Sequence, residues 1–217
     1  MIRIRDISLP PDQAASHLVL SAARLLHIRP QDIRQLDIRR RSVDARKKND
    51  VRVIYTVDVL VRGREDKILK AARCPRASIA DDPVYTLPLP ERLPEQRPVV
   101  VGFGPAGMFA ALVLAEAGLR PIVLERGLDA GSRWKKVERF WQTGELDPEC
   151  NVQFGEGGAG TFSDGKLNTG TKNLRIGWVL ERFADAGADS EILFDAKPHI
   201  GTDVLVSVVQ NLRERII

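Results

Sequence analysis

Along residues 1–80, apolar and polar positions form short blocks that predict strands and a helix. A first strand is predicted by the isoleucines Ile2, Ile4 and Ile7. The segment Pro10-Pro11-Asp12 is expected to open a helix whose apolar face carries Ala15, Leu18, Ala22, Leu25 and Leu26. Apolar residues recur in residues 33–38, and with a period of two in residues 51–59, which predicts two further strands. This β-α-β-β pattern predicts a small α+β domain over residues 1–80.

The hydrophobic pattern is interrupted over residues 81–97. Prolines stand at positions 83, 88, 90 and 94, and another follows at 98. Because proline restricts φ and removes a backbone donor, neither a helix nor a central strand is expected there. We interpret residues 81–97 as an extended linker.

A second domain is predicted over residues 98–217. A short apolar run at 98–101, a helical pattern at 108–117 that ends at Gly118, and a second apolar run at 121–124 indicate a βαβ unit. Further helices are predicted at 174–186 and 204–212, the latter with Thr202 as N-cap, and a short strand at 192–194. A stripe at helical spacing is expected to be core. Its members are Trp134, Val137, Phe140 and Trp141.

Composition is that of an ordinary globular protein, with 43% hydrophobic and 29% charged residues. No apolar run approaches the roughly 20 residues of a membrane helix, and the start lacks the apolar core of a signal peptide, so a cytoplasmic protein is expected. Cys74 and Cys150 lie far apart, and no disulfide framework, metal site or redox dithiol is predicted from them.

Positive charge is concentrated in the first part of the chain. Residues 1–97 hold 20 Lys/Arg and 13 Asp/Glu, whereas residues 98–217 hold 13 and 16. Six of the basic residues lie in RRRSVDARKKND, residues 39–50, which we interpret as a charged hairpin tip. Residues 39–48 could contact a nucleic acid, or the tip could be a solvated loop. The solvated loop is favoured, because no aromatic residues are interleaved for base stacking.

The strongest chemical signal is the turn Gly102-Phe103-Gly104-Pro105-Ala106-Gly107 between the first predicted strand and the helix of the second domain. Gly102 permits the tight turn, Gly104 lets the backbone approach a pyrophosphate, and Gly107 allows close packing of helix on strand. Pro105 suits the first helical turn. Glu125 ends the second strand, where an acidic residue accepts hydrogen bonds from ribose hydroxyls. These features predict dinucleotide binding, and by themselves they do not discriminate between FAD and NAD.

Three segments of the chain resemble a known family. VVVGFGPAGMFAALVLAEAGLRPIVLERG, NVQFGEGGAGTFSDGKLNT and KPHIGTD look like bacterial FAD-dependent dehydrogenases of the NAD(P)/FAD-dependent oxidoreductase family, and SVDARKK with VIYTVDV looks like the small domain ahead of their flavin domain. The resemblance implies a flavin domain of the glutathione-reductase type. It also implies that the glycine-rich segment runs beside the flavin.

Within residues 155–170, six glycines can bring backbone N–H groups against a large planar or anionic ligand. The resemblance places Gly157, Gly158, Ala159 and Gly160 near the cofactor. Polar groups are added by Thr161, Ser163, Asp164 and Lys166, and Lys166 could stabilise negative charge on the reduced flavin. Arg126 and Arg133 are candidates for pairing with the FAD diphosphate. His199 is assigned no role.

Together these signals predict the amino-terminal portion of an FAD-dependent oxidoreductase of α/β class, in which a small α+β domain precedes an incomplete Rossmann-like FAD/NAD(P)-binding domain. The complete enzyme is expected to transfer hydride through flavin, with NAD(P)H or an organic small molecule as donor. Because the chain stops after a predicted helix, we expect the C-terminal half of the enzyme to be missing and this chain to hold the ADP half of FAD at most. No substrate and no catalytic acid, base or nucleophile can be assigned. The alternatives are an NAD-binding Rossmann oxidoreductase and a non-catalytic nucleotide-binding protein with an RNA-binding first domain.

Overall fold

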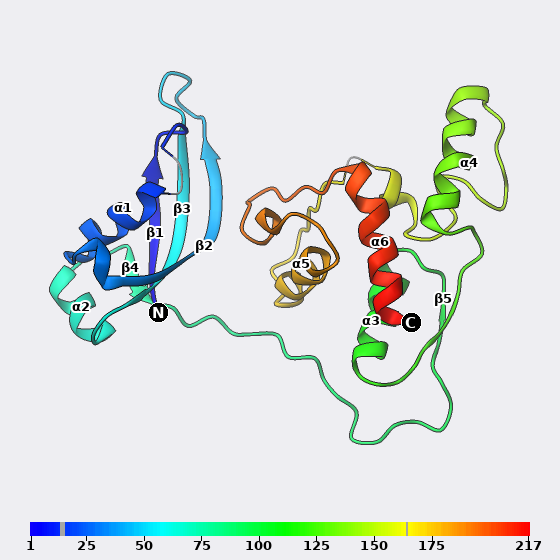
Figure 1. Cartoon of the computed structure of the whole chain (residues 1–217), viewed down its shortest axis with the longest axis horizontal. Coiled ribbons are helices and arrows are strands. Elements are labelled where there is room, and N and C mark those ends of the chain that lie inside the picture. The colour runs from blue at the N-terminus through cyan, green and yellow to red at the C-terminus, as the bar shows by residue number, and fades with distance from the viewer. Residues whose placement is uncertain (14–15, 164) are drawn as a thin grey trace. The chain divides into compact units, whose positions relative to one another are not determined.

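The computed structural model describes residues 1–13, 16–163 and 165–217 (Figure 1). The chain is of mixed α/β class and divides into two compact units. Unit 1 comprises Met1–Pro83 with Leu193–Lys197, and unit 2 comprises Val84–Ile192 with Pro198–Ile217. Two positions used in the sequence predictions, Ala15 and Asp164, lie outside the described residues.

Unit 1 contains an antiparallel sheet of four strands in the order β2-β3-β1-β4. Its strands are β1 (Ile2–Leu9), β2 (Ile33–Asp44), β3 (Arg52–Val61) and β4 (Ala77–Ile79), and its helices are α1 (Ser16–Leu26), η1 (Pro30–Asp32) and α2 (Glu65–Ala72). The resulting β-α-β-β-α-β order, with β3 between β1 and β2, is a split β-α-β arrangement.

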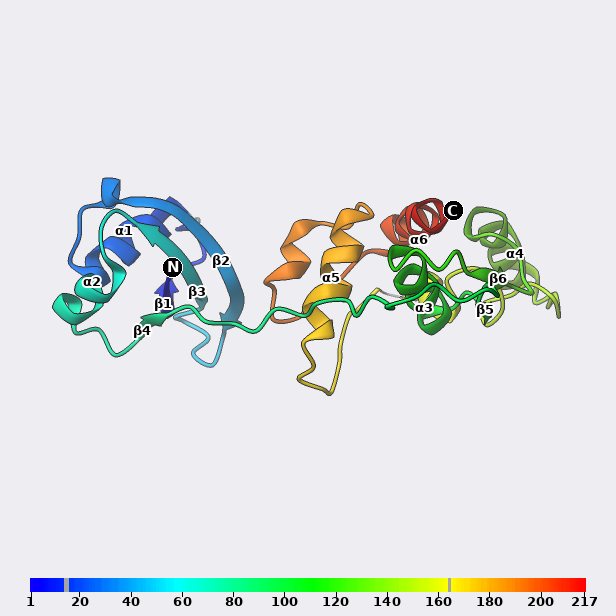
Figure 2. The ribbon, with the colours of Figure 1, turned by 90° about the horizontal axis from the view of Figure 1, so that it is seen from below.

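Figures 1 and 2 show α1 and α2 on the same face of this sheet. Alternate residues of the two central strands point toward these helices, because successive strand residues face opposite sides. Ile4 pairs with Val57 and Ile2 with Val59, and all four side chains are fully buried. The apolar period that predicted these strands is therefore the core of unit 1.

Three expectations for unit 1 need correction. The pattern β-α-β-β omitted α2 and β4, which complete the split arrangement. Residues 39–44 are not part of a hairpin tip, because β2 continues to Asp44, which pairs with Arg52. The tip is limited to residues 45–51. The first helix is described from Ser16 onward and not from the Pro10-Pro11-Asp12 segment, where Pro11 and Asp12 form a turn.

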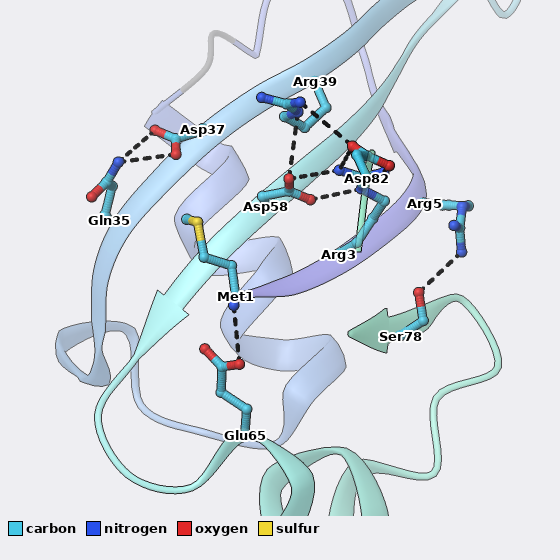
Figure 3. Close-up of polar contacts among 10 residues, drawn as sticks. All are labelled: Met1, Arg3, Arg5, Gln35, Asp37, Arg39, Asp58, Glu65, Ser78 and Asp82. Atoms are coloured by element: carbon cyan, nitrogen blue, oxygen red, sulfur yellow. Dashed lines mark hydrogen bonds and ion pairs between the residues drawn. The ribbon is translucent and has the colours of Figure 1, made fainter. Parts of the chain in front are cut away.

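The opposite face of the sheet carries a network of ionic contacts, shown in Figure 3. Arg3 donates to both oxygens of Asp58 at 2.8 Å, and it also donates to Asp82 at 2.6 Å. Arg39 lies 3.4 Å from Asp58 and 3.5 Å from Asp82. Hydrogen bonding to Asp58 is the main cause that raises the pKa of Arg3. Asp82 thus ties the end of unit 1 to its own sheet.

Residues 81–97 form neither helix nor strand, as the prolines predict. From Val84 onward the stretch belongs to unit 2 and is anchored there. Tyr85 packs edge-on against Trp178 at 6.3 Å between ring centroids. Arg97 donates to the carbonyl oxygens of Arg120 and Pro121.

Unit 2 contains a small parallel sheet in which β5 (Val99–Val101) pairs with β6 (Ile122–Leu124). Its α-helices are α3 (Pro105–Glu116), α4 (Ala130–Thr143), α5 (Arg175–Asp185) and α6 (Thr202–Ile216). Short 3-10 helices are η2 (Ala159–Phe162) and η3 (Ser190–Leu193). In Figure 1, α6 lies beside α3, and the two helices contact each other in the core. None of the described helices is long and apolar enough to cross a membrane.

The predicted β-α-β unit is present, with its helix starting three residues earlier than expected. Gly118, which has a φ of 76°, follows the helix as predicted. The predicted strand at 192–194 is wrong, since η3 occupies Ser190–Leu193. Thr202 is not the N-cap of α6. Gly201 is the N-cap, and the Thr202 hydroxyl donates to the carbonyl oxygen of Ser163.

Candidate functional site

The turn between β5 and α3 has the close backbone packing that its glycines predict. Gly102 has a φ of 89°, a backbone conformation that residues other than glycine rarely adopt. A Cβ atom at Gly107 would lie 1.9 Å from the carbonyl oxygen of Gly102, so only glycine fits there. Gly104 is the N-cap of α3, and Pro105 is its first residue. The amino end of α3 is thereby held against the end of β5.

Glu125 closes the other side of this turn. Its carboxylate accepts hydrogen bonds from the backbone N–H groups of Phe103, at 2.6 Å, and Gly127, at 2.8 Å. A carboxylate can accept about four hydrogen bonds, so two of these bonds leave acceptor capacity on Glu125. The side chain borders a cavity of about 610 Å³, within the range of small-molecule sites. The cavity lining includes Phe103, Val123, Glu125, Leu128, Asp129 and Arg213.

The glycine-rich segment lies directly on the β5–α3 turn, although more than 50 residues separate them in the sequence. The N–H of Gly157 donates to the carbonyl oxygen of Phe103 at 2.8 Å. A Cβ at Gly158 would lie 3.1 Å from Cδ of Pro105 and 3.2 Å from Cα of Gly104. The structure therefore brings together the two segments that were singled out separately in the sequence.

Arg133 lies beneath this segment, where it is completely buried. Its guanidinium donates to five backbone carbonyl groups, those of Asn151, Val152, Gly155, Glu156 and Gly158. It also lies over the ring of Phe162, 4.7 Å from the centroid. These bonds differ from the expected pairing of Arg133 with a diphosphate, because its donors point into the protein. Arg133 shapes the segment that was expected to contact the cofactor.

Glu156 is a buried acid that the sequence interpretation missed. Its carboxylate accepts from the N–H of Ala130 at 2.6 Å, at the start of α4, and pairs with Arg213 of α6 at 3.0 Å. A carboxylate at the amino end of a helix is favoured by the free N–H groups and the helix dipole. Glu156 therefore ties the glycine-rich segment to two helices. Its position in an otherwise glycine-rich run was the only sequence signal for this role.

The other candidates are less closely associated with the turn. Ala159, Gly160, Ser163 and Lys166 are exposed, and the hydroxyl of Ser163 donates to the carbonyl oxygen of Gly160. Thr161 is buried, with its hydroxyl adjacent to Gly157 and without a hydrogen-bond partner among the described residues. The backbone of Lys166 forms an isolated bridge with His199.

Arg126 lies on the surface and is paired with an acid. It donates to both carboxylate oxygens of Glu149 at 2.7 and 2.8 Å, and it also lies over the ring of Phe154. The bonds to Glu149 raise the pKa of Arg126. Through Phe154, Arg126 therefore contacts the start of the segment that Arg133 binds, while its Nε and Nη2 groups donate to Glu149.

The aromatic stripe of α4 is not the core element that its spacing predicts. Val137 is fully buried, but Trp134 and Trp141 are 38% and 55% exposed. The two indoles pack edge-on with 5.9 Å between their ring centroids, and Trp134 also contacts Phe162, the last residue of η2.

No group of His, Cys, Asp and Glu residues among the described residues could hold a metal ion.

Two comparisons with known proteins bear on this chain. A family described as a domain of unknown function (DUF8436) matches residues 1–60. A relative from Clostridium beijerinckii (strain ATCC 51743 / NCIMB 8052), described as an uncharacterized protein, is 46% identical over 218 residues. That match covers 99% of this chain and 40% of the relative, so the chain spans about 40% of the relative's length. Neither description names an activity.

Proposed function

We propose that unit 2 binds FAD and that the chain is the amino-terminal portion of a flavin-dependent oxidoreductase with a Rossmann-like nucleotide domain. The observation that carries this proposal is the packing of Gly157 and Gly158 onto the turn at Gly104 and Pro105. It forms a backbone-lined surface beside the amino end of α3. Anionic phosphates bind well at such helix ends, where N–H groups have no partner within the helix.

The residues of the turn fit a dinucleotide. A Cβ built at Gly104 meets nothing nearer than Cα of Gly158 at 3.9 Å, so this side of the turn is open to a ligand. We assign the diphosphate to the backbone N–H groups of Gly104 and Ala106, on either side of Pro105, which has no N–H, and the ribose hydroxyls to Glu125. FAD, once bound, would supply hydride transfer from NAD(P)H or an organic substrate. The protein's part is to orient the nucleotide and to exclude water from the diphosphate.

The same geometry favours FAD over NAD as the ligand. A simple dinucleotide turn requires the strand, the helix and the acid, whereas this turn has a second wall made by residues 155–160. We propose that this wall begins beside the diphosphate and continues along the part of the ligand beyond it. The wall therefore favours a ligand with a large ring system on that side.

Nucleic-acid binding by unit 1 is the weaker candidate. The basic residues Arg39 and Arg46 are paired with Asp58 and Asp44, which reduces the charge available to phosphates. Residues 1–83 contain one aromatic residue, Tyr55, and it is buried under the helices rather than displayed on the open face. RNA-binding sheets of this topology stack bases on exposed aromatic side chains.

The small sheet supports the proposal that the chain belongs to a larger domain. Its outer face is apolar and exposed, with Val101 at 81% and Val99 at 56% exposure. Parallel sheets occur almost only where both faces are covered. We propose that polypeptide equivalent to the remaining part of the Clostridium relative covers this face. We expect this chain to co-purify with a second polypeptide that corresponds to the remaining part of the relative. Val101→Asp is expected to abolish co-purification, and Val43→Asp is expected to retain it. Independent migration of the unmodified polypeptides would contradict it.

The proposed cofactor is tested by titrating the purified chain with FAD and NAD and following thermal unfolding and FAD fluorescence. We expect reversible binding of added FAD, weaker binding of NAD, and loss of about tenfold in FAD affinity in Glu125→Gln, since hydrogen bonds to charged groups contribute about 1.5–3 kcal/mol. Glu138→Gln, an exposed position on α4, is the matched control. The proposal fails if FAD does not bind, or if NAD binds more tightly.

A further inference from the structure

We propose that Arg133 is the positioning residue that turns the glycine-rich segment into a diphosphate-binding surface, with the backbone N–H of Ala159 as its outward donor. This inference rests on the proposed function, because the diphosphate belongs to the dinucleotide assigned to unit 2. It gives Arg133 a role through the loop and not through contact with the ligand. It also narrows the contacts expected of the glycine-rich segment to one backbone donor, the N–H of Ala159.

The guanidinium is the centre around which the segment folds. Nε donates to the carbonyl of Asn151 and Nη2 to that of Val152, whereas the two N–H groups of Nη1 are shared among the carbonyls of Gly155, Glu156 and Gly158. All five distances lie between 2.7 and 3.3 Å. The shortest of these bonds go to Val152 and Glu156, at 2.7 Å. Burial lowers the pKa of Arg133, and these carbonyl dipoles replace the water that it has lost. A segment with this many bonds to one cation has little freedom to change shape.

The orientation of the carbonyls decides where the N–H groups point. In a trans peptide the C=O of one residue and the N–H of the next point in opposite directions. The peptides whose carbonyls face Arg133 therefore direct their N–H groups away from it. The N–H of Glu156 donates to Leu128, and the N–H of Gly157 donates to Phe103 of the turn. These two bonds fix the segment to the rest of the site.

The last of these peptides along the chain joins Gly158 to Ala159. The carbonyl of Gly158 accepts from Arg133 at 2.8 Å, so the N–H of Ala159 points outward. Ala159 is the exposed first residue of η2, and no acceptor among the described residues takes its N–H. Gly158 itself lies against Gly104 and Pro105, so this donor stands beside the amino end of α3. The N–H of Ala159 and the free N–H groups at the amino end of α3 therefore border the same space, the one assigned to the diphosphate.

The shape of the segment matches an arginine and no smaller cation. Gly155 has a φ of 121°, and a Cβ there would lie 2.5 Å from Cδ of Arg133. Phe162 supports the guanidinium plane from one side. A lysine has three donors on a single nitrogen and cannot reach carbonyls spread around a plane. Arg133→Lys is therefore expected to keep the positive charge but to lose the bonds that hold the glycine-rich segment in its shape.

The test compares two ligands on the full 217-residue chain. FAD carries the diphosphate, whereas AMP carries the adenosine half with one phosphate and depends mainly on Glu125. We expect Arg133→Lys to weaken FAD binding by about tenfold or more, the factor that corresponds to about 1.4 kcal/mol, while AMP affinity changes far less. Arg139→Lys is the matched control, because Arg139 is an exposed arginine of the same helix that pairs with Glu145.

A second variant separates positioning from general stability. Arg133→Ala leaves a buried space lined by the same carbonyl groups, and free guanidinium, at concentrations well below those that unfold proteins, is expected to restore part of its FAD affinity. Equal losses for FAD and AMP, or unchanged FAD affinity in both variants, would overturn the role of Arg133. Failure of the unmodified chain to bind either ligand would instead overturn the proposed function, and this inference with it.

Discussion

Replacing Gly107 by alanine tests whether the β5–α3 turn depends on close backbone contact. The new Cβ would stand 1.9 Å from the carbonyl oxygen of Gly102 and 2.9 Å from its carbonyl carbon. Neither atom can move without shifting the turn. Overpacking costs about 1–3 kcal/mol, and the rigid backbone obstacle places Gly107→Ala near the upper end. Alanine has a higher helix propensity than glycine, which offsets up to about 1 kcal/mol of this cost. We therefore expect the free energy of unfolding of unit 2 to fall by about 2 kcal/mol.

Gly177 provides a control at the equivalent position of another helix. Each glycine is the third residue of its helix, Gly107 in α3 and Gly177 in α5. A Cβ at Gly177 would meet no atom within 4 Å. Gly177→Ala is therefore expected to stabilise unit 2 by as much as about 1 kcal/mol, through helix propensity alone. The two substitutions make the same chemical change and are expected to act in opposite directions.

Tryptophan fluorescence during urea unfolding reports on unit 2 selectively, because all three tryptophans, Trp134, Trp141 and Trp178, belong to it. The midpoint is expected to fall for Gly107→Ala and to rise for Gly177→Ala, at unchanged slope. An unchanged or higher midpoint for Gly107→Ala would refute the contact on which the turn is built. FAD affinity is expected to fall with the first substitution and to be kept with the second.

Two further predictions concern the helices that support the site. Asp129 caps α4, and hydrogen bonding from Ser132 lowers its pKa. Asp129→Ala should cost about 1 kcal/mol at pH 7. This stabilisation is present above the unfolded pKa of about 4, is lost as pH falls through the folded pKa, and should vanish in melts at low pH. Arg213→Met leaves the buried carboxylate of Glu156 without its cation and should cost about 2 kcal/mol in urea unfolding, less than for a fully buried pair because Arg213 is partly exposed. Arg215→Met is the control, and an equal effect would contradict the special role of Arg213.

The parts of the fold that sequence predicted are those specified by local patterns. Strand β3 shows its period of two because alternate side chains enter one core, and the β5–α3 turn shows its glycines because the backbone contacts there require them. Strand β4 is three residues long and exists by pairing with β1, where Ile2 faces Ile79. The extension of β2 through a run of arginines also depends on its partner, since Asp44 pairs with Arg52. Such pairings join distant residues and leave no local period.

The stripe on α4 shows the limit of helical spacing as a signal. Spacing places Trp134, Val137 and Trp141 on one side of the helix, but it does not say what covers that side. In the structure Val137 reaches the core, while the two indoles contact each other at the surface. An apolar face predicts burial only where another element is available to pack against it.

Arg133 and the glycines were both visible in the sequence, yet each was interpreted as a ligand contact in its own right. The structure connects them. Gly155, Gly157 and Gly158 all have positive φ, and these conformations turn the carbonyl groups of the segment inward to the guanidinium. The glycines are therefore needed for the protein's own arginine, whether or not they also face the proposed ligand. An arginine with a glycine cluster about 20 residues away can therefore indicate a preorganised loop. In such a loop the guanidinium binds backbone carbonyl groups of the protein, and the N–H groups that point outward are the ones available to a ligand.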